Sequence, residues 1–213
     1  MPLIADAAGD KLSKRLDSLS IARLREDGIE PMAINSLLAH LGTSDAVEPY
    51  VSLDELLRNF DIGHFGRATP KFDPDELPHL NHRLLQRLGF ADVRDRLPLG
   101  ADERFWLAVR PNLQRLADAG EWWAVVNGPI RPAIEDVGFV TRAHELLPAE
   151  PWSEATWGFW TKSLGAATGR KGKDLYRPLR LALTAREHGP ELKSLLVLIG
   201  RARTEARLLG KEA

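Results

Sequence analysis

The sequence predicts an all-α fold. Apolar residues recur at intervals of three and four through most of the chain, the alternation typical of β-strands is nearly absent, and Gly and Pro mark the loops. The chain has 213 residues. That length can bury a substantial core, in one large domain or in two or three smaller ones.

The composition argues against several classes of site. The chain has no cysteine, and its six histidines do not fall at the spacing of metal ligands, so we expect neither a disulfide nor a metal site. No apolar run approaches the ~18–20 residues of a membrane-spanning helix. The first residues also lack the basic-then-apolar order of a secretion signal. We therefore expect a cytoplasmic protein that does not enter a membrane.

Charge is divided unevenly along the chain, although the net charge is only −1. Residues 148–213 hold 12 Lys and Arg against 7 Asp and Glu, a net of +5, and residues 1–147 hold 17 against 23, a net of −6. The C-terminal third is therefore the part expected to face a polyanion.

In the first half of the chain, helix signals come with clear caps. Ser20 and Ser52 are expected to cap helices through their hydroxyl groups, and Gly28 to end the first of them. On the last of these helices, we interpret Asn81, Arg83 and Arg87 as surface residues, with contacts to RNA phosphates as the alternative. The helices are expected over residues 21–27, 31–41, 53–60 and 78–88.

Further helical segments are expected over residues 92–97 and 102–109. Trp122 and Trp123 are adjacent, so one narrow helical stripe cannot bury both. We interpret both as packing between neighbouring helices, with stacking of one ring on an unpaired base as the alternative. Residues 127–140 have the composition of a linker.

The last third is expected to open a helix at Thr141 and another after a cap at Ser153. On the second of these, Trp157, Trp160 and Leu164 form a stripe that we assign to the core.

Pro178 is expected at an early position of the following helix. Arg180 should project from the side of that helix with its guanidinium free. Residues 188–190 should break the helix, and Pro190 can begin the next one. A closing helix over residues 195–209 is expected to carry its arginines, Arg201, Arg203 and Arg207, to solvent.

Residues 168–180 hold the densest positive charge. Their five cations are Arg170, Lys171, Lys173, Arg177 and Arg180, and Asp174 is the only anion between positions 170 and 180. Gly169 and Gly172 would let this segment bend and bring backbone N–H groups close to a ligand. The pattern is typical of polyanion binding, although exposed Lys and Arg also occur without a function.

Two stretches resemble one enzyme family. The order of residues 168–192, from Thr-Gly-Arg-Lys-Gly-Lys through Tyr-Arg-Pro-Leu-Arg-Leu to Gly-Pro-Glu-Leu, resembles the anticodon-binding domain of bacterial glutamyl-tRNA synthetases. Residues 11–15, Lys-Leu-Ser-Lys-Arg, resemble the Lys-Met-Ser-Lys-Arg signature of class I aminoacyl-tRNA synthetases. The helices between them are similar to the stem-contact region of that family.

This resemblance implies an order of domains along the chain. It comprises the end of a catalytic region with the signature loop, a helical stem-contact region and an α-helical anticodon-binding domain in two parts. The corresponding ranges are 1–16, 17–90, 91–140 and 141–213.

The resemblance also implies site residues. The signature loop would bind ATP phosphates through Lys11, Ser13, Lys14 and Arg15, and the anticodon contacts fall on Arg180, Gly189, Pro190 and Lys193. Lys193 stands where relatives can place an aromatic contact. To these we add Arg170, Lys171 and Lys173 as contacts to the tRNA backbone, argued from charge and turn chemistry.

By this resemblance, a full-length parent would ligate glutamate to its tRNA with ATP and Mg²⁺, acting as a monomer. The sequence does not decide whether it charges the glutamate tRNA alone or the glutamine tRNA as well. No His-Ile-Gly-His motif or βαβ pattern is present, so we assign no catalytic residue and expect this chain to be inactive alone. An alternative is a helical protein-interaction or regulatory module derived from a synthetase, although such a module would not need the ATP-loop signature.

Overall fold

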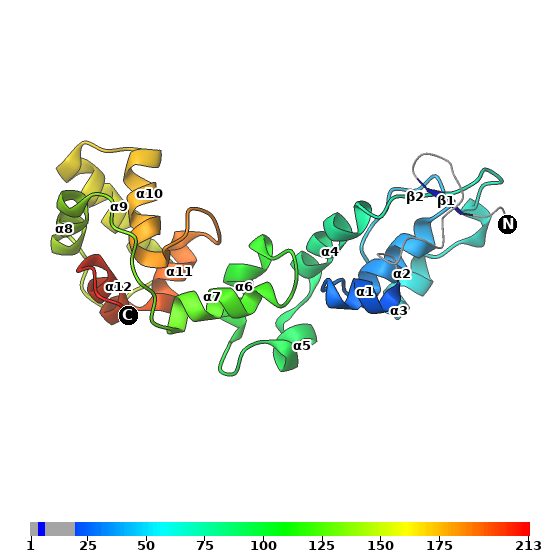
Figure 1. The fold of residues 1–213 in the computed structure, drawn as a ribbon, viewed down its shortest axis with the longest axis horizontal. Helices are drawn as coiled ribbons and strands as arrows, with labels where there is room; N and C mark the ends of the chain where they lie inside the picture. Colours follow the sequence, from blue (N-terminus) through cyan, green and yellow to red (C-terminus); the bar gives the residue numbers. More distant parts are fainter. Residues whose placement is uncertain (1–3, 7–19) are drawn as a thin grey trace. The chain divides into compact units, whose positions relative to one another are not determined.

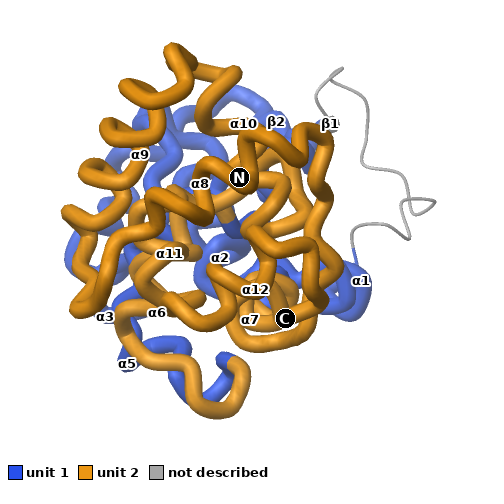
Figure 2. Tube along the Cα trace, turned by 90° about the vertical axis from the view of Figure 1, so that its left-hand side faces the viewer, with its two compact units in different colours: residues 1–97, 113–118 blue, residues 98–112, 119–213 orange. Residues whose placement is uncertain are grey.

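The fold comes from a computed structural model in which residues 4–6 and 20–213 are described. It confirms the predicted all-α class (Figure 1). The chain forms two compact units, residues 1–97 with 113–118 and residues 98–112 with 119–213 (Figure 2). We call these unit 1 and unit 2. The four ranges proposed from the sequence remain predictions.

Unit 1 consists of short helices and one small strand pair. Its elements are β1 (Ala5–Asp6), α1 (Ile21–Glu26), α2 (Pro31–His40), α3 (Leu53–Asn59), the 3-10 helix η2 (Ile62–His64), β2 (Lys71–Phe72), α4 (Glu76–Arg87), α5 (Phe90–Val93) and the 3-10 helix η3 (Arg94–Arg96). β1 and β2 pair in parallel, with Ala5 opposite Lys71. The predicted serine caps are confirmed, because the Ser20 and Ser52 hydroxyls accept hydrogen bonds from the backbone N–H groups of Arg23 and Glu55.

The core of unit 1 lies between α2 and α4, where Leu37 and Leu84 are buried. The interpretation of Asn81 as a surface residue is wrong, because it is fully buried beside them. Its Oδ1 accepts a hydrogen bond from the Glu30 N–H at 2.8 Å, and its Nδ2 donates to the Gln114 carbonyl at 2.7 Å. A buried amide with both ends paired can join the start of α2 to a segment distant in sequence.

Unit 2 is a helical bundle. Its elements are α6 (Glu103–Val109), the 3-10 helix η4 (Arg110–Asn112), α7 (Asp118–Asn127, whose first residue belongs to unit 1), α8 (Val137–Glu145), α9 (Glu154–Thr168), α10 (Lys173–Thr184), α11 (Leu192–Ile199) and α12 (Arg201–Leu208). α9 packs on α11, and Trp160 and Leu164 of α9 are fully buried. None of the helices in the described ranges is long and apolar enough to cross a lipid bilayer.

Three helix boundaries of unit 2 differ from those expected. α8 begins at Val137 instead of Thr141, because the Asp136 carboxylate accepts a hydrogen bond from the Phe139 N–H and caps it. α10 begins at Lys173, so Pro178 lies inside it. The predicted closing helix is two helices, since Gly200 takes a positive φ of 78° between α11 and α12.

Arg207 is the largest departure from the expectation for unit 2. The sequence places it on a solvent face, but its side chain is fully buried. Its guanidinium donates to the carbonyl oxygens of Leu183 at 2.7 Å and of Val125 and Ala213 at 2.8 Å, and to that of Gly128 at 3.2 Å. Burial lowers the pKa of Arg207 to about 10, so it stays protonated at neutral pH.

We predict that Arg207→Met destabilises unit 2. Methionine fills much of the volume but leaves the carbonyls without a donor, and a buried unpaired polar group costs about 1–3 kcal/mol. The expected loss is about 3 kcal/mol or more in the free energy of unfolding, measured by urea denaturation. Arg203→Met, on the same helix and partly exposed, is the control, with a change within about 0.5 kcal/mol. Equal effects of the two variants would contradict the structural role of Arg207.

Candidate nucleic-acid interface

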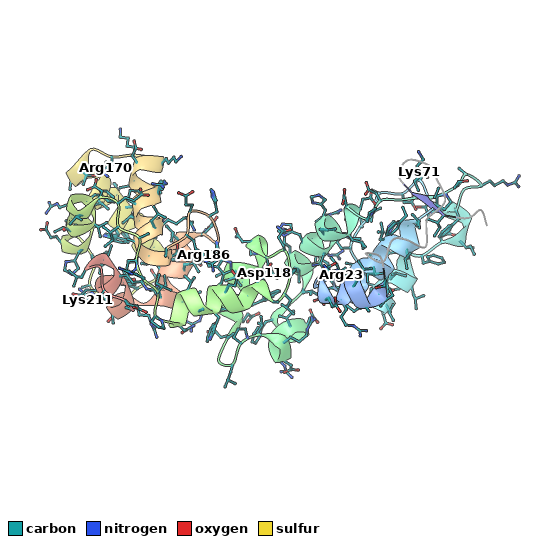
Figure 3. The ribbon with its side chains drawn as sticks, viewed as in Figure 1. Arg23, Lys71, Asp118, Arg170, Arg186 and Lys211 are labelled. Atoms are coloured by element: carbon teal, nitrogen blue, oxygen red, sulfur yellow. The ribbon has the colours of Figure 1, made fainter. Side chains whose placement is uncertain are left out.

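Helices α9, α10 and α11 carry the residues that the sequence singles out. We call residues 168–180 the basic segment; its residues 169–172 join α9 to α10, and residues 185–191 join α10 to α11. Arg170 and Arg186 accordingly lie toward opposite ends of α10 (Figure 3).

The basic segment turns between two glycines with positive φ, Gly169 at 72° and Gly172 at 54°. Arg170, between them, is held in place: its Nη2 lies 2.5 Å from Asp136 Oδ2, and its guanidinium lies 4.5 Å from the centre of the Phe139 ring. Hydrogen bonds from the Phe139 N–H and then from Arg170 lower the pKa of Asp136. The segment is thus anchored to the beginning of α8.

Lys171 and Lys173 are both exposed. No ion pair joins either of them to another described residue. Their ammonium groups are therefore available to an anion from solution.

Carboxylates from other parts of the chain surround Arg177, in the C-terminal half of the basic segment. Arg177 pairs with Glu135 and, at 2.7 Å, with Glu187. These bonds raise the pKa of Arg177 and lower that of Glu187. A hollow of about 900 Å³, the acidic hollow, lies here; its lining residues are Glu135, Asp136, Arg170, Lys173, Asp174, Arg177, Pro178 and Glu187. The sequence shows one anion among five cations, but the fold gives this side of α10 a nearly balanced charge.

Arg180 is not free as expected. It is half-buried, its Nη2 donates to the Pro190 carbonyl at 3.0 Å, and burial lowers its pKa. Its Nη1 is buried and has no hydrogen-bond partner among the described residues. A buried donor without a partner is uncommon, and a turn of the side chain would let this nitrogen donate to an acceptor in the adjoining hollow.

Residues 185–191 are shaped by contact with α7. The Arg186 guanidinium lies 5.1 Å from the centre of the Trp122 ring, and it pairs with Glu121 at 2.9 Å. Gly189 has a φ of 143°, and a Cβ atom there would lie 2.0 Å from the same Trp122 ring. Only glycine therefore fits at position 189. The interpretation of Trp122 as a packing residue is confirmed, since it is buried in this contact.

A second hollow, the aromatic hollow, lies at the other side of α10. It has a volume of about 420 Å³ and is lined by Trp157, Tyr176, Arg180, Glu191, Leu192 and Lys193. Lys193 is exposed and pairs with Glu191 at 2.8 Å, which raises the pKa of Lys193.

The structure brings only some of the predicted site residues together. Arg180 and Lys193 line the aromatic hollow, while the carbonyl of Pro190 holds Arg180 from behind and Gly189 packs on Trp122. Arg170 and Lys173 line the acidic hollow. The predicted ATP-binding residues, Lys11, Ser13, Lys14 and Arg15, lie outside the described residues. The described His, Asp and Glu side chains form no cluster that could hold a metal ion.

Sequence reasoning missed two residues of the aromatic hollow, Trp157 and Tyr176. The stripe that assigned Trp157 to the core holds for Trp160, but Trp157 is only partly buried. No signal in the sequence separates Trp157 from Trp160 or sets Tyr176 apart, because residues three apart share one helical face and Tyr176 has Leu179 at that spacing.

Comparison with known proteins decides the family. The family described as "Anticodon binding domain" matches residues 137–210. Glutamate–tRNA ligase from Azospirillum brasilense is 55% identical over 218 residues, a match that spans 100% of this chain and 49% of the relative. Glutamate–tRNA ligase 2 from Acidiphilium cryptum is 52% identical over 210 residues, which span 98% of this chain and 47% of that relative. The chain belongs to the glutamate–tRNA ligase family.

A solved structure shows the same fold. The glutamate tRNA ligase from Elizabethkingia meningosepticum, in complex with its amino acid, superposes with a TM-score of 0.73 over 97% of this chain and 49% of that one, at 21% identity. Within this glutamate–tRNA ligase family, the chain spans about half the length of the curated relatives it matches. The matched anticodon-binding range includes α8 to α12, and so contains both hollows except for Glu135 and Asp136.

We predict that Asp136 makes unit 2 sensitive to acid. Its folded pKa lies below the ordinary value of 3.8. Its contribution is therefore complete above that value and is lost as the pH falls through the lower, folded pKa. In urea denaturation at about pH 6 and about pH 3, Asp136→Asn should be less stable than wild type at the higher pH, and the difference should be smaller at the lower pH. Asp174→Asn, an exposed carboxylate of the same hollow, is the control; a difference of the same size at both pH values would contradict the assignment.

Proposed function

We propose that this chain supplies the tRNA-binding, anticodon-recognising part of a cytoplasmic enzyme that ligates glutamate to tRNA with ATP and Mg²⁺. The observation that carries the proposal is the aromatic hollow within the range that matches the anticodon-binding family. It offers aromatic faces, a guanidinium with an unpaired nitrogen and an exposed ammonium group. Unpaired RNA bases are recognised by stacking and by hydrogen bonds to their edges.

The roles follow from the contacts. We propose that Arg180 turns its unpaired Nη1 from its buried position into the aromatic hollow and reads a base edge there, while Pro190 and Gly189 hold the guanidinium and the loop in position. Lys193 would give a phosphate or base-edge contact after releasing Glu191. Arg170, Lys171 and Lys173 would contact phosphates, with Arg170 sharing its charge with Asp136.

The remaining parts of the proposal concern the whole enzyme. Lys11, Ser13, Lys14 and Arg15 would bind ATP phosphates, and the catalytic domain of the parent enzyme would supply the glutamate site and the rest of the ATP site. Its partner would be the glutamate tRNA, with the glutamine tRNA as a second substrate to be tested, and the enzyme would act as a monomer.

The test of the proposal is binding of this chain to glutamate tRNA, beside the same tRNA with a replaced anticodon, at roughly 0.1 M salt. We expect the replaced anticodon to weaken binding to the wild type. Arg180→Ala should lower affinity for the native tRNA by about 1–3 kcal/mol and reduce the discrimination between the two RNAs. Arg180→Lys, which keeps the charge and loses the planar fork, should also lose discrimination.

The outcomes separate the alternatives. If Arg180→Ala loses the same affinity for both RNAs, Arg180 contacts a phosphate and does not read a base. If wild type binds neither RNA, either the catalytic half is needed for affinity or the chain is a protein-interaction module, and adding that half in trans separates the two.

We further predict that Lys171→Gln and Lys173→Gln weaken binding of both tRNAs equally. Each phosphate contact removed should reduce the slope of log affinity against log salt by roughly 0.7–0.9. Lys211 is an exposed lysine of unit 2 outside the basic segment. Lys211→Gln is therefore the matched control and should leave the slope unchanged. An unaltered slope in the first two variants would show that the basic segment does not touch the RNA.

A further inference from the structure

Arg177 is a cation of the basic segment that the fold turns away from the aromatic hollow. It lies one helical turn after Lys173 and three residues before Arg180 on α10. Its side chain lines the acidic hollow, whereas that of Arg180 lines the aromatic hollow. A free arginine so close to the candidate interface would attract the phosphates of any RNA.

Two glutamates from different segments hold the Arg177 guanidinium. Its Nη1 donates to Glu135, and its Nη2 donates to Glu135 at 3.0 Å and to Glu187 at 2.7 Å. Glu135 precedes α8, and Glu187 belongs to the loop between α10 and α11. We call these three residues the Glu135–Arg177–Glu187 bridge. It exists only in the folded chain, because its members are far apart in the sequence.

The bridge is charged and open to solution. The hydrogen bond from Arg177 lowers the pKa of Glu187, so this carboxylate is ionised at neutral pH. About a third of the Arg177 side chain and more than half of each glutamate side chain are exposed. Exposed ion pairs contribute little to stability. The larger effect of the bridge is therefore on the charge that an approaching ligand meets.

The two glutamates set the sign of the charge in the acidic hollow. The lining residues include four carboxylates and three cations, a net charge of −1. Without the charges of Glu135 and Glu187, two carboxylates would face the same three cations, a net charge of +1. These two residues thus decide whether this side of α10 repels or attracts a phosphate backbone.

This difference affects the choice between RNAs more than the affinity for one of them. Phosphate contacts strengthen binding of every RNA, whereas contacts to base edges depend on sequence. Arg177 would have to leave two carboxylates before it could contact a phosphate. It therefore adds little to the binding of an RNA whose bases do not fit.

We propose that Glu135 and Glu187 are specificity-determining residues. By holding Arg177 and keeping the acidic hollow negative, they exclude phosphates from this side of α10 and limit the binding of RNA with the wrong anticodon. Selectivity of this kind comes from repelling the wrong ligand as well as from attracting the right one. The inference rests on the proposed function and deepens it, because it assigns part of the choice between RNAs to residues that do not contact a base.

The test measures binding of the whole chain to glutamate tRNA, to the same tRNA with a replaced anticodon and to a single-stranded homopolymer of uridine, over a range of salt concentrations. The variant with both Glu135→Gln and Glu187→Gln should bind the uridine polymer about 3- to 10-fold more tightly at roughly 0.1 M salt. Its salt slope should steepen by roughly 0.7, the value for one added phosphate contact with a single strand. Glutamine keeps an acceptor oxygen for Arg177 and removes only the charge.

The same variant should lose discrimination between the two tRNAs. Native tRNA is held in one register by its bases and should gain little affinity. The tRNA with the replaced anticodon is free to shift and place a phosphate at Arg177, so it should gain more.

Two further variants identify the cause. Glu145→Gln is the matched control, because Glu145 is also an exposed glutamate of unit 2 paired with an arginine, Arg142, at 2.7 Å, but it lies outside the acidic hollow. It should leave affinity and salt slope nearly unchanged. Adding Arg177→Gln to the double variant should return binding of the uridine polymer to nearly the wild-type level, since the released cation is then gone.

Circular dichroism and thermal unfolding establish that each variant folds. If the double variant binds the uridine polymer no more tightly than Glu145→Gln does, the two glutamates only join segments of the chain and the inference is overturned. It is also overturned if the triple variant keeps the raised affinity, because Arg177 is then not the cation that the glutamates hold.

The inference and the proposed function can fail separately. If wild type distinguishes the two tRNAs and the double variant distinguishes them equally well, the role of Glu135 and Glu187 is overturned and the proposed function stands. If wild type binds both tRNAs equally, the proposed function fails, whatever the double variant does with the uridine polymer.

Discussion

The buried guanidinium of Arg207 fixes the segments on which unit 2 depends. It donates to carbonyl oxygens at the end of α7, near the end of α10 and at Ala213, and so joins three segments far apart in the sequence. The hydrogen bonds to these carbonyl oxygens offset the free-energy cost of burying the charged guanidinium, and without Arg207 the carbonyls would lose this donor. Leu183, one of these partners, lies three residues after Arg180, so the same bonds hold the helix that presents the candidate anticodon residue.

A second constraint divides the two sides of α10 by charge. Glu135, Asp136 and Glu187 meet Arg170 and Arg177 on one side, and there the cations serve to hold α8, α10 and the following loop together. Elsewhere on α10, Tyr176 and Arg180 line the aromatic hollow, where neither of them forms an ion pair with a described residue. Some cations of this region form ion pairs within the protein, and only the others can bind a ligand. A count of cations in the sequence therefore overstates the size of the binding surface.

Much of the fold could be predicted because its signals are local. Ser20 and Ser52 cap helices through bonds to N–H groups three residues away, and the periodicity of Trp160 and Leu164 marks a buried face. α10 starts earlier than Pro178 predicts, because Gly172, six residues before it, is the N-cap of the helix. Asn81 and Arg207 were assigned to the surface because polar residues usually lie there, and their partners come from distant segments.

The sequence by itself determined the helical class, the family resemblance and the identity of Arg180 and Lys193 as candidates, since these depend on residue order and short spacing. Tertiary structure alone decided which cations are neutralised, that one nitrogen of Arg180 lacks a partner, and that Trp157 and Tyr176 lie beside it. The reason is physical: ion pairing, burial and ring contacts depend on which distant segments meet, and a one-dimensional pattern of charge carries no distance between residues such as Glu135 and Arg177.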